Sequence, residues 1–279
     1  MKKITKAMIF AAGFGKRLVP LTDKTPKPLL QLNGKTLLEN CILFLEDCGI
    51  KEIVINVHHL AGQIIEFINK NKFKSKIHIS HEKEKILGTG GGLIYAKNNI
   101  KNFFQSWESF VAINPDTLWN SNYISEFNIL EEWNFKCKEA GFVLLLVPKN
   151  NCYETREQGD FDLKYPTDDK DRGHTTTGVA GKQYPWMSEI ALVEKNNIKN
   201  YIYTGLQIVR PNRTSDDVKS GLYDPRAKGL GLDARNYWTI NENWDKGNHI
   251  YGYASKQKFY HVSNLETFSN LKKEKIITY

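Results

Sequence analysis

The chain has 279 residues, of which 41% are hydrophobic and 25% are charged. No apolar run approaches the roughly 18 residues of a membrane-spanning helix, which excludes an integral helical membrane protein. The formal net charge of +8 suits phosphorylated ligands or nucleic acid. The basic residues are spread along the chain, however, without a basic recognition helix or a basic-aromatic RNA-binding signature. We therefore expect neither nucleic acid nor a membrane as a partner.

The N-terminal sequence, MKKITKAMIFAAGFGKR, begins like a secretory signal peptide. Its apolar core, residues 7–12, is too short for such a signal, and Lys16 and Arg17 follow soon after. We therefore predict a buried first strand at this position and a cytoplasmic protein.

The first half of the chain alternates predicted strands and helices. Near-continuous apolar runs predict the strands, and apolar stripes at helical spacing predict the helices between them. Such alternation is typical of a mostly parallel sheet that is covered by helices on both faces. The predicted strands are residues 6–12, 51–57, 76–82, 109–116 and 142–148, and the predicted helices are residues 36–49, 60–71, 92–100 and 124–141.

The second half of the chain changes character at a polar stretch. Residues 150–187 contain few apolar side chains, and we predict an extended insertion there. With no internal repeat and no clear linker, we expect one domain over residues 1–279. Further strands are predicted at residues 189–195, 200–209, 249–254 and 258–262, followed by a helix at residues 265–273.

A basic, glycine-rich loop follows the first strand, with the sequence AAGFGKRLVPLTDKTPKPLL over residues 11–30. A strand that leads into such a loop is a common phosphate site, because glycine lets backbone N–H groups approach the anion. The loop does not fit the Walker pattern, which needs Ser or Thr where Arg17 stands, or the dinucleotide pattern, which needs Gly where Leu18 stands. Its lysines and arginine can neutralise phosphates, and its prolines limit its flexibility. The residues alone therefore predict a stiffened cationic loop that binds phosphate.

The loop resembles the signature of the nucleotide-sugar pyrophosphorylases, or sugar-1-phosphate nucleotidyltransferases, which can be written G-x-G-x-R-x-x-P-L-T-x-x-x-P-K-P. Every fixed position of that signature is present between Gly13 and Pro28. The resemblance continues in LGTGGGL at residues 87–93, in Asp116 within AINPDTLW, and in YIYTGLQI at residues 201–208. It therefore covers most of the chain.

A further segment narrows the resemblance to a subgroup. VINVHHLAGQI, at residues 54–64, is similar to N-acetylmuramate-1-phosphate uridylyltransferases and their mannose-1-phosphate guanylyltransferase-like relatives. The family resemblance implies a Rossmann-like three-layer α/β/α fold with a mostly parallel mixed sheet. It also implies a nucleotide-binding half at residues 1–149, the polar insertion at residues 150–187, and a sugar-binding and C-terminal part at residues 188–279.

The resemblance implies that UTP or GTP is joined to a sugar 1-phosphate with release of pyrophosphate. Arg17 and Lys27 would be catalytic, with Arg17 on the triphosphate and Lys27 between the α-phosphate and the incoming sugar phosphate. Lys16 would assist the leaving pyrophosphate. The implied nucleotide-binding residues are Ala11, Ala12, Gly13, Gly15, Lys16, Arg17, Glu82, Gly88, Thr89, Gly90 and Gly91, and the implied sugar-phosphate-binding residues are Lys27, Asn114, Glu194, Lys195, Thr204 and Gly205.

The resemblance also implies a Mg²⁺ site at Asp116, which ends a predicted buried strand. Relatives complete this site with an aspartate near the C-terminus, and the matching segment here, FYHVSNLETF, has His261 at that position. Imidazole is a poor ligand for Mg²⁺. Three alternatives therefore stay open: His261 ligates the metal, Asp116 and the phosphates hold it while His261 contacts phosphate, or the site is degraded.

The subgroup similarity favours UTP and N-acetylmuramate 1-phosphate as substrates, with a mannose-1-phosphate guanylyltransferase as the alternative. A choline-phosphate cytidylyltransferase would use the same loop on a different acceptor. His261 and the polar insertion also leave open a non-catalytic nucleotide-binding regulator. His58 and His59 lie at a strand end without a third metal ligand nearby in the sequence, so we expect them to be structural.

Overall fold

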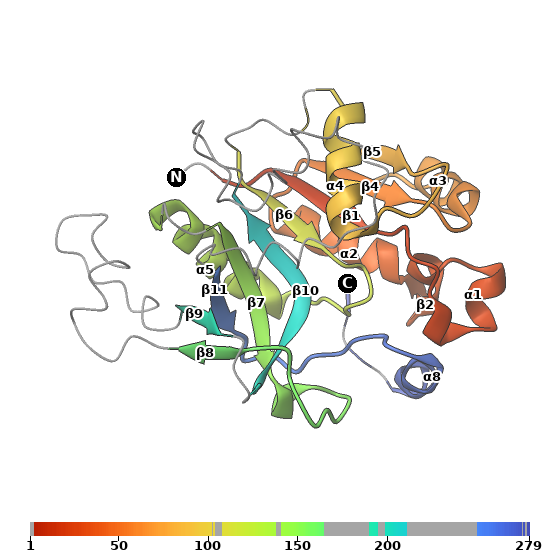
Figure 1. Ribbon diagram of the computed structural model, residues 1–279. Helices are drawn as coiled ribbons and strands as arrows, with labels where there is room; N and C mark the ends of the chain where they lie inside the picture. Colours follow the sequence, from red (N-terminus) through yellow and green to blue (C-terminus); the bar gives the residue numbers. More distant parts are fainter. Residues whose placement is uncertain are drawn as a thin grey trace.

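A nine-stranded mixed sheet runs through the part of the chain that the structure describes (Figure 1). The structure, a computed structural model, describes residues 3–101, 103, 108–137, 141–164, 190–194, 199–210, 250–274, 276 and 278–279. The strand order of the sheet is β5-β4-β1-β6-β10-β7-β11-β9-β8. The strands are β1 (Lys6–Phe10), β4 (Glu52–Val57), β5 (Lys76–His81), β6 (Phe110–Ile113), β7 (Phe142–Pro148), β8 (Asp162–Lys164), β9 (Ile190–Glu194), β10 (Tyr201–Val209) and β11 (Ile250–Ala254), and a separate hairpin joins β2 (Gln31–Leu32) to β3 (Lys35–Thr36).

The strands of the large sheet, except β9 and β10, point the same way. β1 is parallel to both β4 and β6, β5 is parallel to β4, and β11 is parallel to β7. β10 lies antiparallel between β6 and β7, and β9 lies antiparallel between β11 and β8. This arrangement confirms the predicted mixed sheet that is mostly parallel.

The strand that was predicted at residues 258–262 is reduced to isolated bridges. Phe259 pairs with Cys152 in parallel, and His261 pairs with Thr117 antiparallel. Because the two partners belong to different segments that run in different directions, neither pairing extends into a ladder. The C-terminal segment instead joins two loops at the edge of the sheet.

Helices cover both faces of the sheet, and Figure 1 shows α4 lying across β1 and β4. α2 begins after Thr36, whose Oγ1 accepts the backbone N–H of Glu39 at 3.0 Å. α4 begins at Gly88, earlier than predicted, so that the glycine-rich segment forms its first turn. None of the helices in the described ranges is both long and apolar enough to cross a membrane. The helices are α1 (Leu21–Lys24), α2 (Leu37–Asp47), α3 (Ala61–Lys70), α4 (Gly88–Asn99), α5 (Asn122–Lys136) and α8 (Leu265–Lys273), with single 3₁₀ turns η1 (Lys16–Leu18), η2 (Lys27–Leu29) and η3 (Lys149–Asn151).

The interior strand β1 is buried on both of its faces. Ala7 and Ile9 pack into a core that includes residues of α2, α3 and α5. Met8, between them, packs on the opposite face with Leu93 and Ala96 of α4. Because successive side chains of a strand point to opposite faces, this division produces the three layers and explains the continuous apolar run of the strand.

The carboxyl ends of β1, β4 and β6 lie at one edge of the sheet, because these strands are parallel neighbours. The loops that follow them begin at Ala11, His58 and Asn114. In open α/β sheets ligands bind at this edge, outside the carboxyl ends of the strands. The fold therefore brings together the motifs that the sequence separates.

Candidate functional site

The glycine-rich loop after β1 has a conformation that requires glycine at position 15. Gly15 has a φ of +65°, and a Cβ atom there would lie 2.7 Å from Cγ2 of Thr22. The hydroxyl of Thr22 in turn donates to the carbonyl of Gly15 at 3.0 Å. The turn at Gly15 is therefore held against Thr22 of α1, and Lys16 and Arg17 follow this turn in η1.

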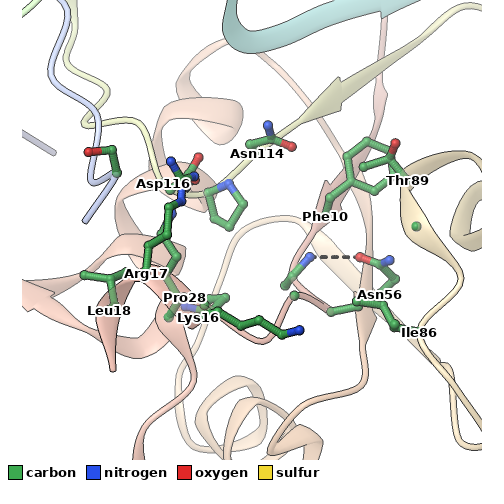
Figure 2. A pocket seen from close by; sticks show the side chains of 18 residues that line it. Phe10, Lys16, Arg17, Leu18, Pro28, Asn56, Ile86, Thr89, Asn114 and Asp116 are labelled. Carbon is green, nitrogen blue, oxygen red and sulfur yellow. Dashed lines mark hydrogen bonds and ion pairs between the residues drawn. The ribbon is translucent and has the colours of Figure 1, made fainter. Parts of the chain in front are cut away.

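A buried hydrogen-bond chain, Asn56–Glu82, joins this loop to the start of α4. Asn56 Oδ1 accepts the backbone N–H of Ala11 at 2.8 Å (Figure 2). Asn56 Nδ2 donates to Glu82 Oε1 at 2.7 Å. Glu82 Oε2 accepts the N–H of Leu87 at 2.9 Å. Burial raises the pKa of Glu82, although the donors Leu87 and Asn56 oppose that shift. A Cβ atom on Gly92 would lie 2.5 Å from Glu82 Oε1, so the chain depends on glycine in α4.

The two histidines that follow β4 connect the segments around the pocket by hydrogen bonds. His58 Nδ1 lies 2.6 Å from the carbonyl oxygen of Glu82, and His59 Nε2 lies 2.8 Å from the carbonyl oxygen of Thr22. Each ring therefore hydrogen-bonds to the backbone of a neighbouring loop. These contacts agree with the structural role that the sequence predicts for the two residues.

The charged end of the site is centred on Asp116. Its Oδ2 lies 2.6 Å from Lys27 Nζ and 3.1 Å from His261 Nε2. His261 is positioned by backbone pairing, because the N–H of Val262 donates to the carbonyl of Asp116 at 2.9 Å and that of Leu118 donates to Tyr260. Burial alone would raise the pKa of Asp116, but the ammonium of Lys27 and the ring of His261 outweigh burial and hold that pKa well below its usual range.

The residues around Asp116 fit a magnesium ion that arrives with a phosphate ligand. Among the described residues, no group of three or more His, Cys, Asp or Glu side chains could hold a metal ion alone. Mg²⁺ is commonly bound by one or two carboxylates together with substrate phosphates and water, and Asp116 offers one carboxylate.

His261 is a weaker candidate for a metal ligand than the sequence implies. Arg156 Nη2 lies 3.5 Å from His261 Nδ1. The ionised carboxylate of Asp116 can only accept, so Nε2 of His261 carries a proton and donates to it. Both ring nitrogens are occupied in this arrangement, which agrees better with Asp116 and phosphates as the ligands. Ligation by His261 stays a prediction.

A pocket of about 370 Å³ lies between the loops. In Figure 2 Phe10, Asn56, Ile86 and Thr89 lie on one side of it, and Arg17 and Asp116 lie on the other. The predicted site residues that line the pocket are Ala11, Ala12, Gly13, Gly15, Lys16, Arg17, Lys27, Gly88, Thr89, Asn114 and Asp116. The lining residues that were not among the predicted site residues are Phe10, Leu18, Pro28, Asn56, Ile86, Pro115 and Ser263.

Other predicted residues lie behind the pocket. Glu82 is only 1% exposed, and both of its carboxylate oxygens accept hydrogen bonds from Asn56 and Leu87. Gly90 and Gly91 are buried in the first turn of α4. The nucleotide contacts predicted for these three residues stay predictions.

The predicted sugar-side residues are only partly placed at the pocket. The carbonyl of Gly205 accepts the backbone N–H of Asn114 at 2.9 Å, and Thr204 Oγ1 donates to Leu145 at 2.8 Å, so both support the pocket wall. Glu194 ends β9, and one of its carboxylate oxygens lies 3.8 Å from Nζ of a lysine in β8. Lys195 lies outside the described residues. The sugar-phosphate contacts of this group therefore stay predictions.

Known proteins are similar to parts of this chain in sequence. The family model described as nucleotidyl transferase matches residues 6–150. Mannose-1-phosphate guanylyltransferase 1 of Arabidopsis thaliana is 32% identical over 146 residues, which cover 52% of this chain and 38% of that protein. N-acetylmuramate alpha-1-phosphate uridylyltransferase of Neisseria meningitidis serogroup B is 37% identical over 123 residues, which cover 44% of this chain and 51% of that protein. The matches thus span about half of these relatives or less.

Solved structures share the fold over nearly the whole chain. UDP-glucose pyrophosphorylase complexed with UDP-glucose aligns with a TM-score of 0.66 and 15% identity, covering 97% of each chain. CTP:phosphocholine cytidylyltransferase from Streptococcus pneumoniae aligns with a TM-score of 0.61 and 21% identity, covering 98% of this chain and 99% of the other. At such low identity these likenesses establish the fold and leave the substrate open.

Proposed function

The chain belongs to the nucleotidyl transferase family, and on that basis we propose that it transfers a nucleoside monophosphate from a nucleoside triphosphate to a sugar 1-phosphate. One observation carries the proposal. A single pocket is lined by the glycine-rich loop after β1 with its Arg17 and Lys27, and by Asp116, which follows β6. Backbone donors and cations that converge on one pocket suit a reaction between two phosphorylated substrates.

In this reaction an oxygen of the sugar phosphate forms a bond to the α-phosphorus. The bond from that phosphorus to the bridging oxygen breaks, and its electron pair leaves with pyrophosphate. No general base is needed, because the attacking phosphate oxygen is already a nucleophile. The task of the protein is to bring two anions together and to stabilise the charge of the transition state.

The cations of the pocket would divide this task. Lys27, which is held by Asp116 at 2.6 Å, would neutralise the α-phosphate and the incoming phosphate. Arg17 would hold the triphosphate with its planar fork, and Lys16 would interact with the departing pyrophosphate. A magnesium ion held by Asp116 and the phosphates would supply further neutralisation of the triphosphate charge.

We propose UTP and N-acetylmuramate 1-phosphate as the substrate pair. Support comes from the segment VINVHHLAGQI and from the uridylyltransferase of Neisseria meningitidis, at 37% identity. The alternative is GTP with mannose 1-phosphate, supported by the guanylyltransferase of Arabidopsis thaliana at 32% identity. A choline-phosphate acceptor is supported only by the structural similarity to the cytidylyltransferase of Streptococcus pneumoniae.

A substrate matrix tests these proposals. Each of UTP, GTP, CTP, ATP and dTTP is incubated with Mg²⁺ and each of N-acetylmuramate 1-phosphate, mannose 1-phosphate, glucose 1-phosphate and choline phosphate, and pyrophosphate release is measured. We expect the fastest release with UTP and N-acetylmuramate 1-phosphate. Nucleotide binding without release from any pair would support the non-catalytic regulator instead.

A further inference from the structure

A second pocket adjoins the first one at Arg17 and Ser263, which line both. This second pocket, here named the annex, has a volume of about 660 Å³. Its walls come from residues 153–156, which follow β7 and η3, and from residues 263–270 at the start of α8. No residue of the annex belongs to the signature loop except Arg17, so the family motif does not account for it.

The wall that carries Arg156 is fixed before any ligand binds. The N–H of Tyr153 donates to the carbonyl of Phe259 at 2.9 Å, which ties this segment to the strip that also holds His261. The next residue, Glu154, is anchored to the beginning of α8. Its carboxylate accepts hydrogen bonds from the side chains of Ser263, Asn264 and Thr267.

Arg156 has donors to spare for an anion. Its Nη2 lies 3.5 Å from Nδ1 of the His261 ring, and its charge also acts on the neighbouring Glu154 carboxylate. A guanidinium carries five N–H donors in a planar fork, and one long contact with the His261 ring leaves most of them for a ligand. Arg17, on the other side of the annex, is exposed at the mouth of the first pocket. The two arginines therefore line one space.

Two carboxylates also line the annex. Glu154 accepts hydrogen bonds from three side chains of the α8 segment and keeps its negative charge, which acts on Arg156 and offsets part of its positive charge, while Arg17 stands on the other side. Glu266 is exposed at the rim, where water screens its charge. Of the other lining side chains, Thr155 and Asn270 carry a hydroxyl and an amide group that can donate to an oxyanion as well.

We propose that Arg156 and Arg17 make the annex a second phosphate-binding site, distinct from the position of the α-phosphate. The proposal rests on the proposed function, which requires the site to handle a leaving pyrophosphate and an acceptor phosphate. Because Arg17 lines both pockets, an anion can pass into the annex without losing contact with that guanidinium. Arginine is suited to this role, since its fork matches two oxygens of one phosphate.

Binding of small anions to the full chain tests the proposal without turnover. Pyrophosphate and mannose 1-phosphate are titrated separately by calorimetry in metal-free buffer, with wild type, Arg156→Ala, Arg156→Gln and Arg156→Lys. Lys273→Ala is the matched control, because it removes one exposed positive charge of α8 that lines neither pocket. Thermal unfolding of each variant is recorded alongside, and the glutamine and lysine variants carry the test if the alanine variant does not fold.

We expect Arg156→Ala to weaken one of the two anions by about tenfold or more, Lys to restore part of the loss, and Lys273→Ala to change little. Loss of pyrophosphate binding alone assigns the annex to the leaving group, and loss of sugar-phosphate binding alone assigns it to the acceptor. Unchanged affinities in folded Arg156 variants, or no binding of either anion to wild type, would overturn the proposal. An Arg156-dependent anion site in a chain that fails the substrate matrix would leave the annex standing and refute only the proposed reaction.

Discussion

At the scale of single residues, Asp116 and Lys27 show how the pocket is charged. The Oδ2 atom of Asp116 receives both Lys27 and His261, so the carboxylate holds two nitrogen groups close together. Asp116 therefore prepares Lys27 for an anion, since the ammonium is already in place before a phosphate arrives. Such preorganised charge is the main source of transition-state stabilisation in reactions of this kind.

We predict that Lys27→Ala lowers kcat by about 10²–10³-fold, because one charge is lost where negative charge develops. Nucleotide affinity should change by a few-fold only, because the glycine-rich loop and Arg17 remain. Pre-steady-state turnover and equilibrium nucleotide binding measure the two effects separately. Lys24→Ala is the matched control, since Lys24 is an exposed lysine of the same loop that does not line the pocket. Turnover close to wild type in Lys27→Ala would show that Lys27 is not catalytic.

The two glycines of the loop provide a second test at this scale. Gly15→Ala should be unfavourable twice over, because alanine in the left-handed region costs about 1–2 kcal/mol and its Cβ would lie 2.7 Å from Thr22 Cγ2. Gly13→Ala should have little effect on stability, because a Cβ there meets no atom within 4 Å. Urea unfolding compares the pair. Equal stability of the two variants would contradict the loop conformation described above.

At the scale of elements, the Asn56–Glu82 chain links β1, β4 and α4. The side chain of Asn56 accepts a hydrogen bond from the backbone N–H of Ala11, and the side chain of Glu82 accepts one from the backbone N–H of Leu87. The two glycine segments of the motif are thereby fixed relative to each other, although they are separated in the sequence. Glu82 thus acts as a positioning residue for the pocket walls.

Gly92→Ala should disturb this chain from inside α4. The new methyl group would lie 2.5 Å from Glu82 Oε1 and 2.7 Å from Asn56 Nδ2. We expect lower stability and weaker nucleotide binding, although alanine favours a helix by about 1 kcal/mol over glycine. Gly62→Ala in α3, where a Cβ meets no atom within 4 Å, should instead raise stability. Thermal unfolding and nucleotide titration measure the two effects. A Gly92→Ala variant that is more stable than wild type would argue against a rigid Asn56–Glu82 hydrogen-bond chain.

At the scale of the whole molecule, the sequence predicts the layers and the phosphate loop better than the details of the site. β1, β4 and β6 are buried on both faces, so their continuous apolar runs are visible as strands, and their parallel order places the motifs at one edge. The spacing from Gly13 to Lys27 identifies the loop because backbone turns and cations must occur at fixed positions.

Contacts between distant segments are not encoded in such local patterns. Asn56 reaches Ala11 and Arg156 reaches His261 only because the chain folds back on itself, and neither residue stands out in the sequence. Glu82, which follows β5, is buried and bonds to the N–H of Leu87 before α4, so its predicted contact with the nucleotide stays a prediction. Side-chain direction depends on the partner elements, which a motif does not specify.

Asp116 joins three distant segments of the molecule, so its charge should contribute to the stability of the whole fold. Because its pKa is lower in the folded state, this contribution is complete above the unfolded pKa of about 3.9 and is lost as the pH falls further. Asp116→Asn should therefore be less stable than wild type at pH 7 by about 2 kcal/mol, less than for a fully buried pair because water reaches both partners. The difference should shrink at pH 3. Urea unfolding at both pH values measures it, with the exposed Asp23→Asn as control. A difference that does not depend on pH would mean that packing, and not the charge of Asp116, accounts for the loss.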